Sequence, residues 1–290
     1  MRAGIGTKLV HTFSSHEKVR LRQIDPNETL GIDKSEAKDR VEWLEERLGD
    51  LQEKLYAAGR NAVLIVLQGL DTSGKDGTIR RAMRMLNPAG CRVEAFKEPT
   101  PLELRHDFIW RIHNVAPQLG MMTIFNRSQY EDVLVARVHK LVPKHVWETR
   151  YDRINEFERL LCENGTIIIK FMLHISKKEQ RDRLLAREAD KDKAWKLSTA
   201  DWPEHERYDE YIEAYQDAIE RCSTPFAPWH VVPADRKWFR DLAIGQTVVD
   251  IMALYEKRWH EDIELRGARA LRVVKEELGH GTPILRASHG

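Results

Sequence analysis

Apolar residues recur at alternating steps of four and three between Asp33 and Gly59, the spacing that places side chains on one face of an α-helix. Asp33 and Glu36 have the spacing of a capping box, so the pattern predicts an amphipathic helix that begins near Asp33 and ends near Gly59. The residues of the apolar face are Ala37, Val41, Leu44, Leu48, Leu51 and Leu55.

After this helix the pattern changes to short apolar runs separated by stretches of helical length. Runs such as AVLIVL and TIIIKF have few polar interruptions, as expected for strands covered by helices on both faces. The alternation of strand and helix predicts a three-layer α/β domain around a mainly parallel, five-stranded sheet. The predicted strands are Ala62–Gln68, Cys91–Phe96, Met121–Phe125, Thr166–Ile175 and Trp229–Val232.

The remaining stretches suggest one domain with two appendages. Residues 1–32 show little periodicity and predict an irregular arm, whereas residues 33–263 form the domain, with a last helix from about 237 to 258. A charge-dense segment, residues 176–202, follows the fourth predicted strand. Residues 264–290 end in GHGTPILRASHG and predict a partly ordered tail.

Composition narrows the class of protein. Of the residues, 42% are hydrophobic and 32% charged, as in soluble globular proteins. The 47 basic and 46 acidic residues leave a net charge of +1, so we expect no nucleic-acid partner, and any polyanion site must be local. The three cysteines form no CxxC, and no apolar run is long enough for a membrane span or an export signal. We therefore expect a cytoplasmic protein.

The most informative motif is GLDTSGKDG, which follows the first predicted strand. It matches the phosphate-binding pattern G-x-x-x-x-G-K-[S/T] through Gly69, Gly74 and Lys75, but Asp76 occupies the position of the usual hydroxyl. Glycines let backbone N–H groups turn inward, Lys75 supplies a positive charge, and the helix that follows contributes its dipole. The motif predicts a phosphate site, with an ordinary glycine-rich turn as the alternative.

Two acids in this loop need a separate explanation. Asp71 and Asp76 would repel bound phosphates unless a divalent cation lay between them, and Mg²⁺ prefers such oxygen ligands. Asp71 is therefore a candidate metal ligand. Asp76 is equally compatible with metal binding and with a place in the first turn of the helix.

A second motif, FNRSQYEDV, ends the third predicted strand. It places Asn126 and Arg127 at the carboxyl edge of the sheet, where open α/β folds bind ligands. Arg127 is a candidate charge clamp on a transferring phosphoryl group. Glu131 and Asp132 could be metal ligands or simple acids of a first helical turn.

The charge-dense segment contains Arg183 and Arg187 four residues apart, hence on one helical face. A solvated helix would explain this run by itself. Its position after a late strand is also that of a nucleotide-kinase lid, which closes over phosphates and excludes water. Both interpretations predict helix.

Together these motifs resemble the polyphosphate kinase 2 family of polyphosphate:nucleotide phosphotransferases, over about residues 19–255. The resemblance rests on five motifs in order: GLDTSGKDG, LRHDFIWRIH, FNRSQYEDVLVARV, RLLAREADKDKAWK and PWHVVPADRKWFRDL. It implies a P-loop kinase-like domain with a helical lid. The lid departs from the family's pattern at Lys191, where proline is usual.

The resemblance also implies site residues and substrates. Asp71, Lys75, Arg127 and Asn126 would be catalytic, and Asp71, Asp76 and Glu131 would bind Mg²⁺, with Mn²⁺ as an alternative. With Asn126, the motif is similar to that of the branch that accepts both AMP and ADP, whereas the ADP-preferring branch usually has Asp at this position. The implied phosphate-binding residues are Gly74, Lys75, Gly77, Arg127, Arg183, Arg187, Lys193 and Lys196.

The expected reaction is direct, in-line transfer of the terminal phosphate of inorganic polyphosphate to AMP or ADP. An ATP-dependent nucleoside-monophosphate kinase and a nucleotide-binding regulator are the alternatives. We also expect a homo-oligomer, a dimer or tetramer.

Overall fold

The computed structural model describes residues 9–15, 17–192, 195 and 197–278. Six strands in this part of the chain form one sheet in the order β1-β6-β5-β2-β4-β3. All neighbours pair in parallel except β1, which is antiparallel to β6. The strands are β1 (His11–Phe13), β2 (Ala62–Gln68), β3 (Cys91–Ala95), β4 (Met122–Asn126), β5 (Thr166–His174) and β6 (Trp229–Pro233).

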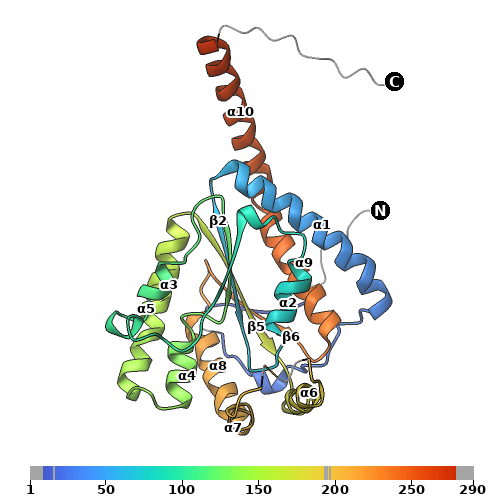
Figure 1. Cartoon of the computed structure of the whole chain (residues 1–290), viewed down its shortest axis with the longest axis vertical. Coiled ribbons are helices and arrows are strands. Elements are labelled where there is room, and N and C mark those ends of the chain that lie inside the picture. The colour runs from blue at the N-terminus through green and yellow to red at the C-terminus, as the bar shows by residue number, and fades with distance from the viewer. Residues whose placement is uncertain (1–8, 16, 193–194, 196, 279–290) are drawn as a thin grey trace.

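Two layers of helices cover the sheet, as predicted (Figure 1). Side chains of β2 alternate between them: Val63 and Ile65 pack with α1 and α9, whereas Leu64 and Val66 pack with α4, α5 and α8. This alternation explains why β2 is apolar throughout. The first layer is α1 (Lys34–Ala58), α2 (Lys75–Ala82) and α9 (Lys237–Ala253), and the second is α3 (Trp110–His113), α4 (Glu131–Val138), α5 (Lys144–Glu163) and α8 (Tyr208–Cys222).

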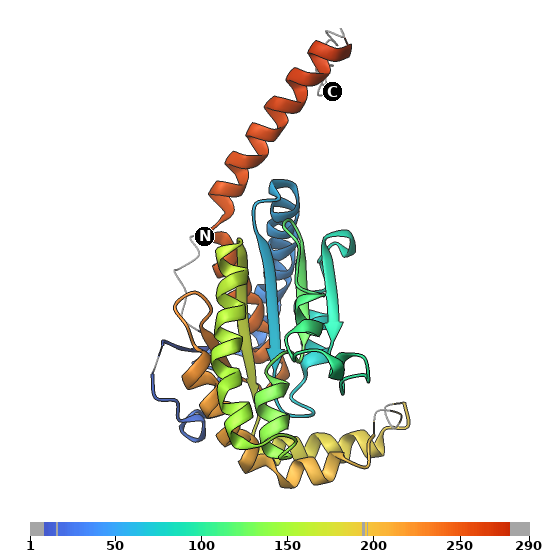
Figure 2. The ribbon, with the colours of Figure 1, turned by 90° about the vertical axis from the view of Figure 1, so that its left-hand side faces the viewer.

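The other elements lie at the two ends of the sheet. At the carboxyl edge are α6 (Lys177–Ala189) and α7 (Asp201–Glu206), whereas α10 (Glu256–Leu278) projects from the opposite end (Figures 1 and 2). Short 3₁₀ turns among the described residues are η1 (Leu21–Gln23), η2 (Pro88–Gly90) and η3 (Glu103–Arg105). Within the described residues, no helix is both long enough and apolar enough to cross a bilayer.

The predicted count of five strands is wrong, because β1 adds a sixth. β1 has only three residues, too few to show a period of two, and its partner β6 lies more than 200 residues away. The segment is not a free arm, since Leu9, Val19 and Leu21 are buried. Long-range pairing, which local sequence does not encode, orders this part of the chain.

The predicted first helix is confirmed, with two details of its ends. Gly59 has φ +58, in the left-handed region, and stops the helix as glycine commonly does. Asp33 is the residue before the first turn, but its side chain makes no capping hydrogen bond. The predicted capping box is therefore wrong.

The C-terminal region is more helical than predicted. The last predicted helix is two helices, α9 and α10, and residues 264–278 continue α10 instead of forming a tail. Trp259, fully buried, anchors the start of α10 to the body. Residues 279–290 lie outside the described residues.

Candidate active site

The loop after β2 turns directly into α2 at the carboxyl edge of the sheet. Gly74 has φ +103, and a Cβ atom there would lie 1.8 Å from Nη1 of Arg240. The positive φ favours glycine, and any side chain would also have to displace the buried guanidinium of Arg240. The loop thus places the N-terminus of α2 at the edge of the sheet, where helix N-termini bind anions.

Lys75 lies inside this loop. Its Nζ atom donates hydrogen bonds to the carbonyl oxygens of Gly69, at 2.7 Å, and Leu70, at 3.3 Å. Burial, followed by the positive charge of Arg127, lowers the pKa of Lys75 to about 8. A phosphate group bound beside Lys75 would favour its charged form.

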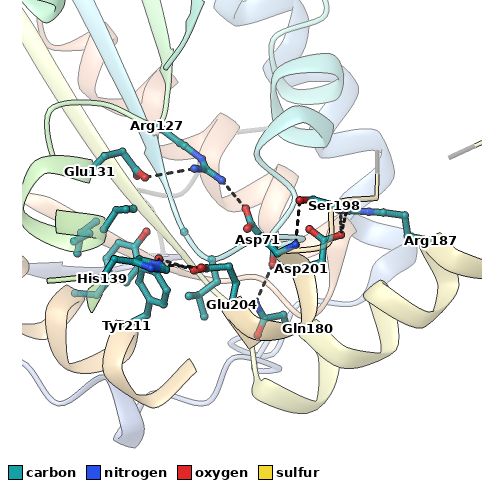
Figure 3. A pocket seen from close by; sticks show the side chains of 16 residues that line it. Asp71, Arg127, Glu131, His139, Gln180, Arg187, Ser198, Asp201, Glu204 and Tyr211 are labelled. Carbon is teal, nitrogen blue, oxygen red and sulfur yellow. Dashed lines mark hydrogen bonds and ion pairs between the residues drawn. The ribbon is translucent and has the colours of Figure 1, made fainter. Parts of the chain in front are cut away.

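Arg127 links two of the predicted metal ligands (Figure 3). Its Nη2 atom donates to Oδ1 of Asp71 at 2.6 Å, and its Nη1 atom lies 3.5 Å from Oε2 of Glu131. Burial opposes the charge of Arg127, but Glu131 and Asp71 more than offset it and raise the pKa of the guanidinium. Arg127 therefore remains a fixed positive charge between two carboxylates.

Asn126, at the end of β4, and Asp76, in the first turn of α2, form a second pair. Nδ2 of Asn126 donates to Oδ1 of Asp76 at 2.8 Å. The contact arises because β2 and β4 are adjacent, so that both motifs end at the same edge. Sequence reasoning considered each residue alone and missed the pair.

The two arginines of α6 have different surroundings. Arg187 donates to Oδ2 of Asp201 at 3.2 Å and faces the P-loop (Figure 3). Arg183 donates from Nε to Glu179 at 2.7 Å, and from its terminal nitrogens to backbone carbonyls of the P-loop and of the segment after β6. Lys193 and Lys196 lie outside the described residues.

The hydrogen bonds of Arg183 indicate a structural role. Its Nη1 atom reaches the carbonyls of Thr72, at 2.9 Å, and Ser73, at 3.1 Å; its Nη2 atom reaches those of Ala234 and Asp235, both at 2.8 Å. Every nitrogen of the side chain thus has an acceptor within the protein. This geometry favours a role in holding the P-loop against α6 over the predicted contact with phosphate.

Two cavities meet at the Asp71–Arg127 pair. The smaller, about 450 Å³, lies between the P-loop, α4, α7 and α8 (Figure 3). The larger, about 1160 Å³, lies between α2, the end of β3 and α6. Both are lined by Asp71, Arg127, Arg187 and Ser198. A group bound at this junction is accessible from two sides.

The charges of the two cavities differ. The larger one is lined by nine basic and four acidic residues, among them Lys75, Arg80, Arg81, Lys97 and Lys237. The smaller one is lined by four acidic and two basic residues, together with apolar Leu134 and Val135 and with Tyr211 and His139. A junction between a strongly basic cavity and a mixed one suits two different substrates.

Sequence reasoning missed a network in the smaller cavity. Nε2 of His139 lies 2.8 Å from Oε1 of Glu204, and the hydroxyl of Tyr211 donates to Oε2 of Glu204 at 2.7 Å. Burial raises the pKa of Tyr211, so its hydroxyl remains a donor. The three residues come from three separate helical segments, and no local spacing signals their contact.

Arg240 was also missed, although it lies in a quoted motif. Its guanidinium is buried, donates to Oδ1 of Asp241 from Nε at 2.9 Å and Nη2 at 2.6 Å, and reaches the carbonyl of Ser73 at 3.3 Å. It therefore packs under the P-loop at Gly74 and beside Gly77. The motif PWHVVPADRKWFRDL could have indicated that Arg240 has a role, but not that it packs under the P-loop.

The carboxylates fit a divalent ion only in part. Among the described residues, no three side chains of His, Cys, Asp or Glu are grouped so that they could hold a metal ion by themselves. Mg²⁺ commonly binds through one or two carboxylates and completes its octahedron with substrate phosphates and water. Asp71, at the junction of the cavities, suits such a shared site.

Comparison with known proteins adds independent evidence. Residues 31–260 match the family model described as polyphosphate kinase 2. A relative from Meiothermus ruber, named AMP/ADP-polyphosphate phosphotransferase, is 46% identical over 237 residues, which cover 81% of this chain and 89% of the relative. An ADP-polyphosphate phosphotransferase from Rhodopseudomonas palustris is 41% identical, covering 80% and 85% of the two chains.

The fold comparison agrees. A crystal structure of polyphosphate kinase 2 from Arthrobacter aurescens TC1 superposes with a TM-score of 0.79 at 44% identity, covering 81% of this chain and 85% of that chain. The family match spans the P-loop, the Arg127 motif and the lid but ends before most of α10. This chain belongs to the polyphosphate kinase 2 family.

Proposed function

We propose that this protein transfers the terminal phosphoryl group of inorganic polyphosphate directly to AMP and ADP. The observation that carries the proposal is the junction of two cavities at Asp71 and Arg127. Direct transfer requires donor and acceptor to approach one reacting phosphorus atom from opposite sides. The family membership and the names of the relatives supply the identity of the two substrates.

In this proposal the cations of the junction stabilise the reacting phosphate. Lys75 and Arg127 neutralise its spreading negative charge, and Arg187 contributes from the lid side. The attacking phosphate oxygen of AMP or ADP is already anionic, so no strong general base is needed. Orientation and charge neutralisation would then supply most of the rate enhancement.

A divalent metal ion belongs to the reaction of this family, and we propose Mg²⁺. Asp71 would hold it together with phosphate oxygens, and Asp76 and Glu131 are further candidates. Because Arg127 already contacts Asp71 and Glu131, metal and guanidinium would share these carboxylates. The metal would supply charge neutralisation across the transferring phosphate.

Acceptance of AMP is a finer part of the proposal. Asn126, which donates to Asp76, leaves the rim of the loop with one negative charge fewer than an aspartate would. A cytoplasmic location is also proposed; the three free cysteines suit a reducing compartment.

The test is product formation with polyphosphate as the sole phosphoryl donor. Purified protein, Mg²⁺ and polyphosphate are incubated with AMP, ADP, GMP or GDP, and products are separated by ion-exchange chromatography. We expect ADP from AMP and ATP from ADP, and loss of both products in Lys75→Ala and Asp71→Ala variants of unchanged far-UV circular dichroism. Products that form only when ATP is added would instead identify an ATP-dependent kinase.

A further inference from the structure

A second basic groove lies at the end of the sheet opposite the P-loop. It has a volume of about 710 Å³ and is lined by residues of the C-terminal end of α1, the loop before β4 and α10. The helix α10 projects from this end of the sheet (Figures 1 and 2). Four arginines and one aspartate line it, together with small and apolar residues. The charged residues are Arg60, Arg266, Arg269, Arg272 and Asp262.

Part of this groove is held in place by contacts to the body. Arg60 pairs with Asp262, with Nη2 donating to Oδ1 at 2.7 Å, and Arg266 donates from Nη1 to the carbonyl of Ala57 at 2.8 Å. Arg266 can approach because Gly59 has no side chain: a Cβ atom there would lie 3.0 Å from Nη1 of Arg266. The groove is therefore a built feature of the fold.

Two arginines remain available to a ligand. Arg269 has no hydrogen bond or ion pair among the described residues, and Arg272 has only a 3.7 Å contact with Glu276 in the next turn of the same helix. Since Asp262 is engaged by Arg60, the groove carries an uncompensated positive charge. The whole chain has a net charge of only +1, so this charge is concentrated locally.

The spacing of these arginines suits a ligand with repeated charges. Arg266, Arg269 and Arg272 are three residues apart, so successive side chains are displaced by about 4.5 Å along the axis of α10. Most of α10 lies beyond the residues matched by the family. The reaction common to the family does not account for these three arginines.

We propose that this groove is a second binding site for inorganic polyphosphate, which holds a distant part of a long chain while the chain's end occupies the P-loop cavity. The substrate class rests on the proposed function. Arg60 stands just before β2 and the P-loop just after it, so the seven residues of β2 separate the two sites by at least about 23 Å. A long chain can span this distance, whereas tripolyphosphate cannot.

Linking two weak sites through one chain raises the local concentration of the donor at the P-loop. The inference therefore predicts an effect on the KM for long polyphosphate and none on kcat. It also predicts that binding of long polyphosphate persists in part when the P-loop site is disabled.

The first experiment compares donors of different length. In the double variant Arg269→Ala/Arg272→Ala, we expect the KM for long-chain polyphosphate to rise roughly tenfold, below the 10²- to 10⁴-fold gain that well-matched linked sites can reach. The kinetics with tripolyphosphate should not change. In the charge-preserving variant Arg269→Lys/Arg272→Lys, the KM for long-chain polyphosphate should stay close to that of the wild type.

The matched control is Lys144→Ala/Arg153→Ala, which removes two exposed cations from α5. This control should leave the KM for long chains unaltered. An equal rise in both double variants would show a general effect of net charge and overturn the proposal. So would an unchanged KM for long chains in Arg269→Ala/Arg272→Ala.

The second experiment does not depend on turnover. Binding of long-chain polyphosphate to Lys75→Ala protein is measured by calorimetry, with and without the Arg269→Ala/Arg272→Ala substitutions. Loss of binding with the substitutions supports the groove even if no nucleotide is ever phosphorylated. Unchanged binding, or tighter binding of single-stranded RNA than of polyphosphate at equal salt, would contradict it.

Discussion

The contact between Asn126 and Asp76 allows a sharp test of how the loop controls charge. In Asn126→Asp, a carboxylate replaces an amide that donates to Oδ1 of Asp76 at 2.8 Å. Two unit charges at that distance repel by about 6 kcal/mol at an effective dielectric constant of 20 and about 1.5 kcal/mol in bulk water. Because Asp76 is exposed, the lower value is the better guide.

A repulsion of about 1.5 kcal/mol corresponds to roughly a tenfold change in an equilibrium constant. It can be relieved by a cation, so we expect Asn126→Asp to require more Mg²⁺ for half-maximal rate. AMP and ADP place their attacking phosphates at different distances from the nucleoside, so the added charge should affect them unequally. We expect kcat/KM for AMP to fall roughly tenfold relative to that for ADP.

The assay is a Mg²⁺ titration of initial rates with each nucleotide at fixed polyphosphate concentration. Asn126→Ala is the control, because it removes the hydrogen bond without adding charge. If Asn126→Asp kept both the wild-type Mg²⁺ dependence and the wild-type ratio of AMP to ADP use, the charge argument would be refuted. The same shift in Asn126→Ala would assign the effect to the lost hydrogen bond.

Three further predictions concern two residues of the P-loop and one buried ion pair. In the protein without substrate, Lys75 has a pKa of about 8 and is charged below that pH, so kcat/KM should decline above pH 8. Lys75→Arg should move this decline to higher pH, and an unmoved profile would exclude Lys75 as its cause. Gly74→Ala should lower the free energy of unfolding by roughly 1–3 kcal/mol and reduce kcat, measured by urea denaturation and initial rates; wild-type values for both would contradict the geometry of the loop. Lys170 is fully buried against Glu158 at 2.6 Å, so Lys170→Met should cost about 3–5 kcal/mol in urea denaturation, whereas exposed Lys178→Met should cost almost nothing. Equal stability of the two methionine variants would show that the buried pair is unimportant.

Much of the fold could be predicted because its strands and first helix have strong local patterns. Each of the five predicted strands is present, with ends displaced by at most one residue. The clearest are β2 and β5, because buried parallel strands are near-continuous apolar runs, whereas β3 is a partly exposed strand at the edge of the sheet. β1 could not be found in this way, because its three residues are ordered by pairing with β6. The helix after residue 264 was missed because the glycines of the terminal GHGTPILRASHG suggested a partly ordered tail.

The site was predictable as a set of motifs but not as a set of contacts. Adjacent strands bring Asp71 to Arg127 and Asp76 to Asn126, and the sequence alone does not say which residues pair. Arg183 resembled a phosphate ligand because only its charge and spacing were visible. Its contacts to backbone carbonyls depend on the close approach of three distant segments. The role of Arg240 could not be predicted for the same reason, because its contact with Ser73 joins segments that are distant in the sequence.

In the proposed reaction, phosphate passes directly from polyphosphate to the nucleotide. The most direct measurement uses ³²P-labelled polyphosphate, unlabelled AMP and Mg²⁺, with hexokinase and glucose present to remove traces of ATP at the start. The account predicts that label appears in ADP at the rate at which AMP disappears, with none retained on the protein. Label released as free phosphate or held on the protein, or ADP formation that stops when ATP is removed, would contradict it.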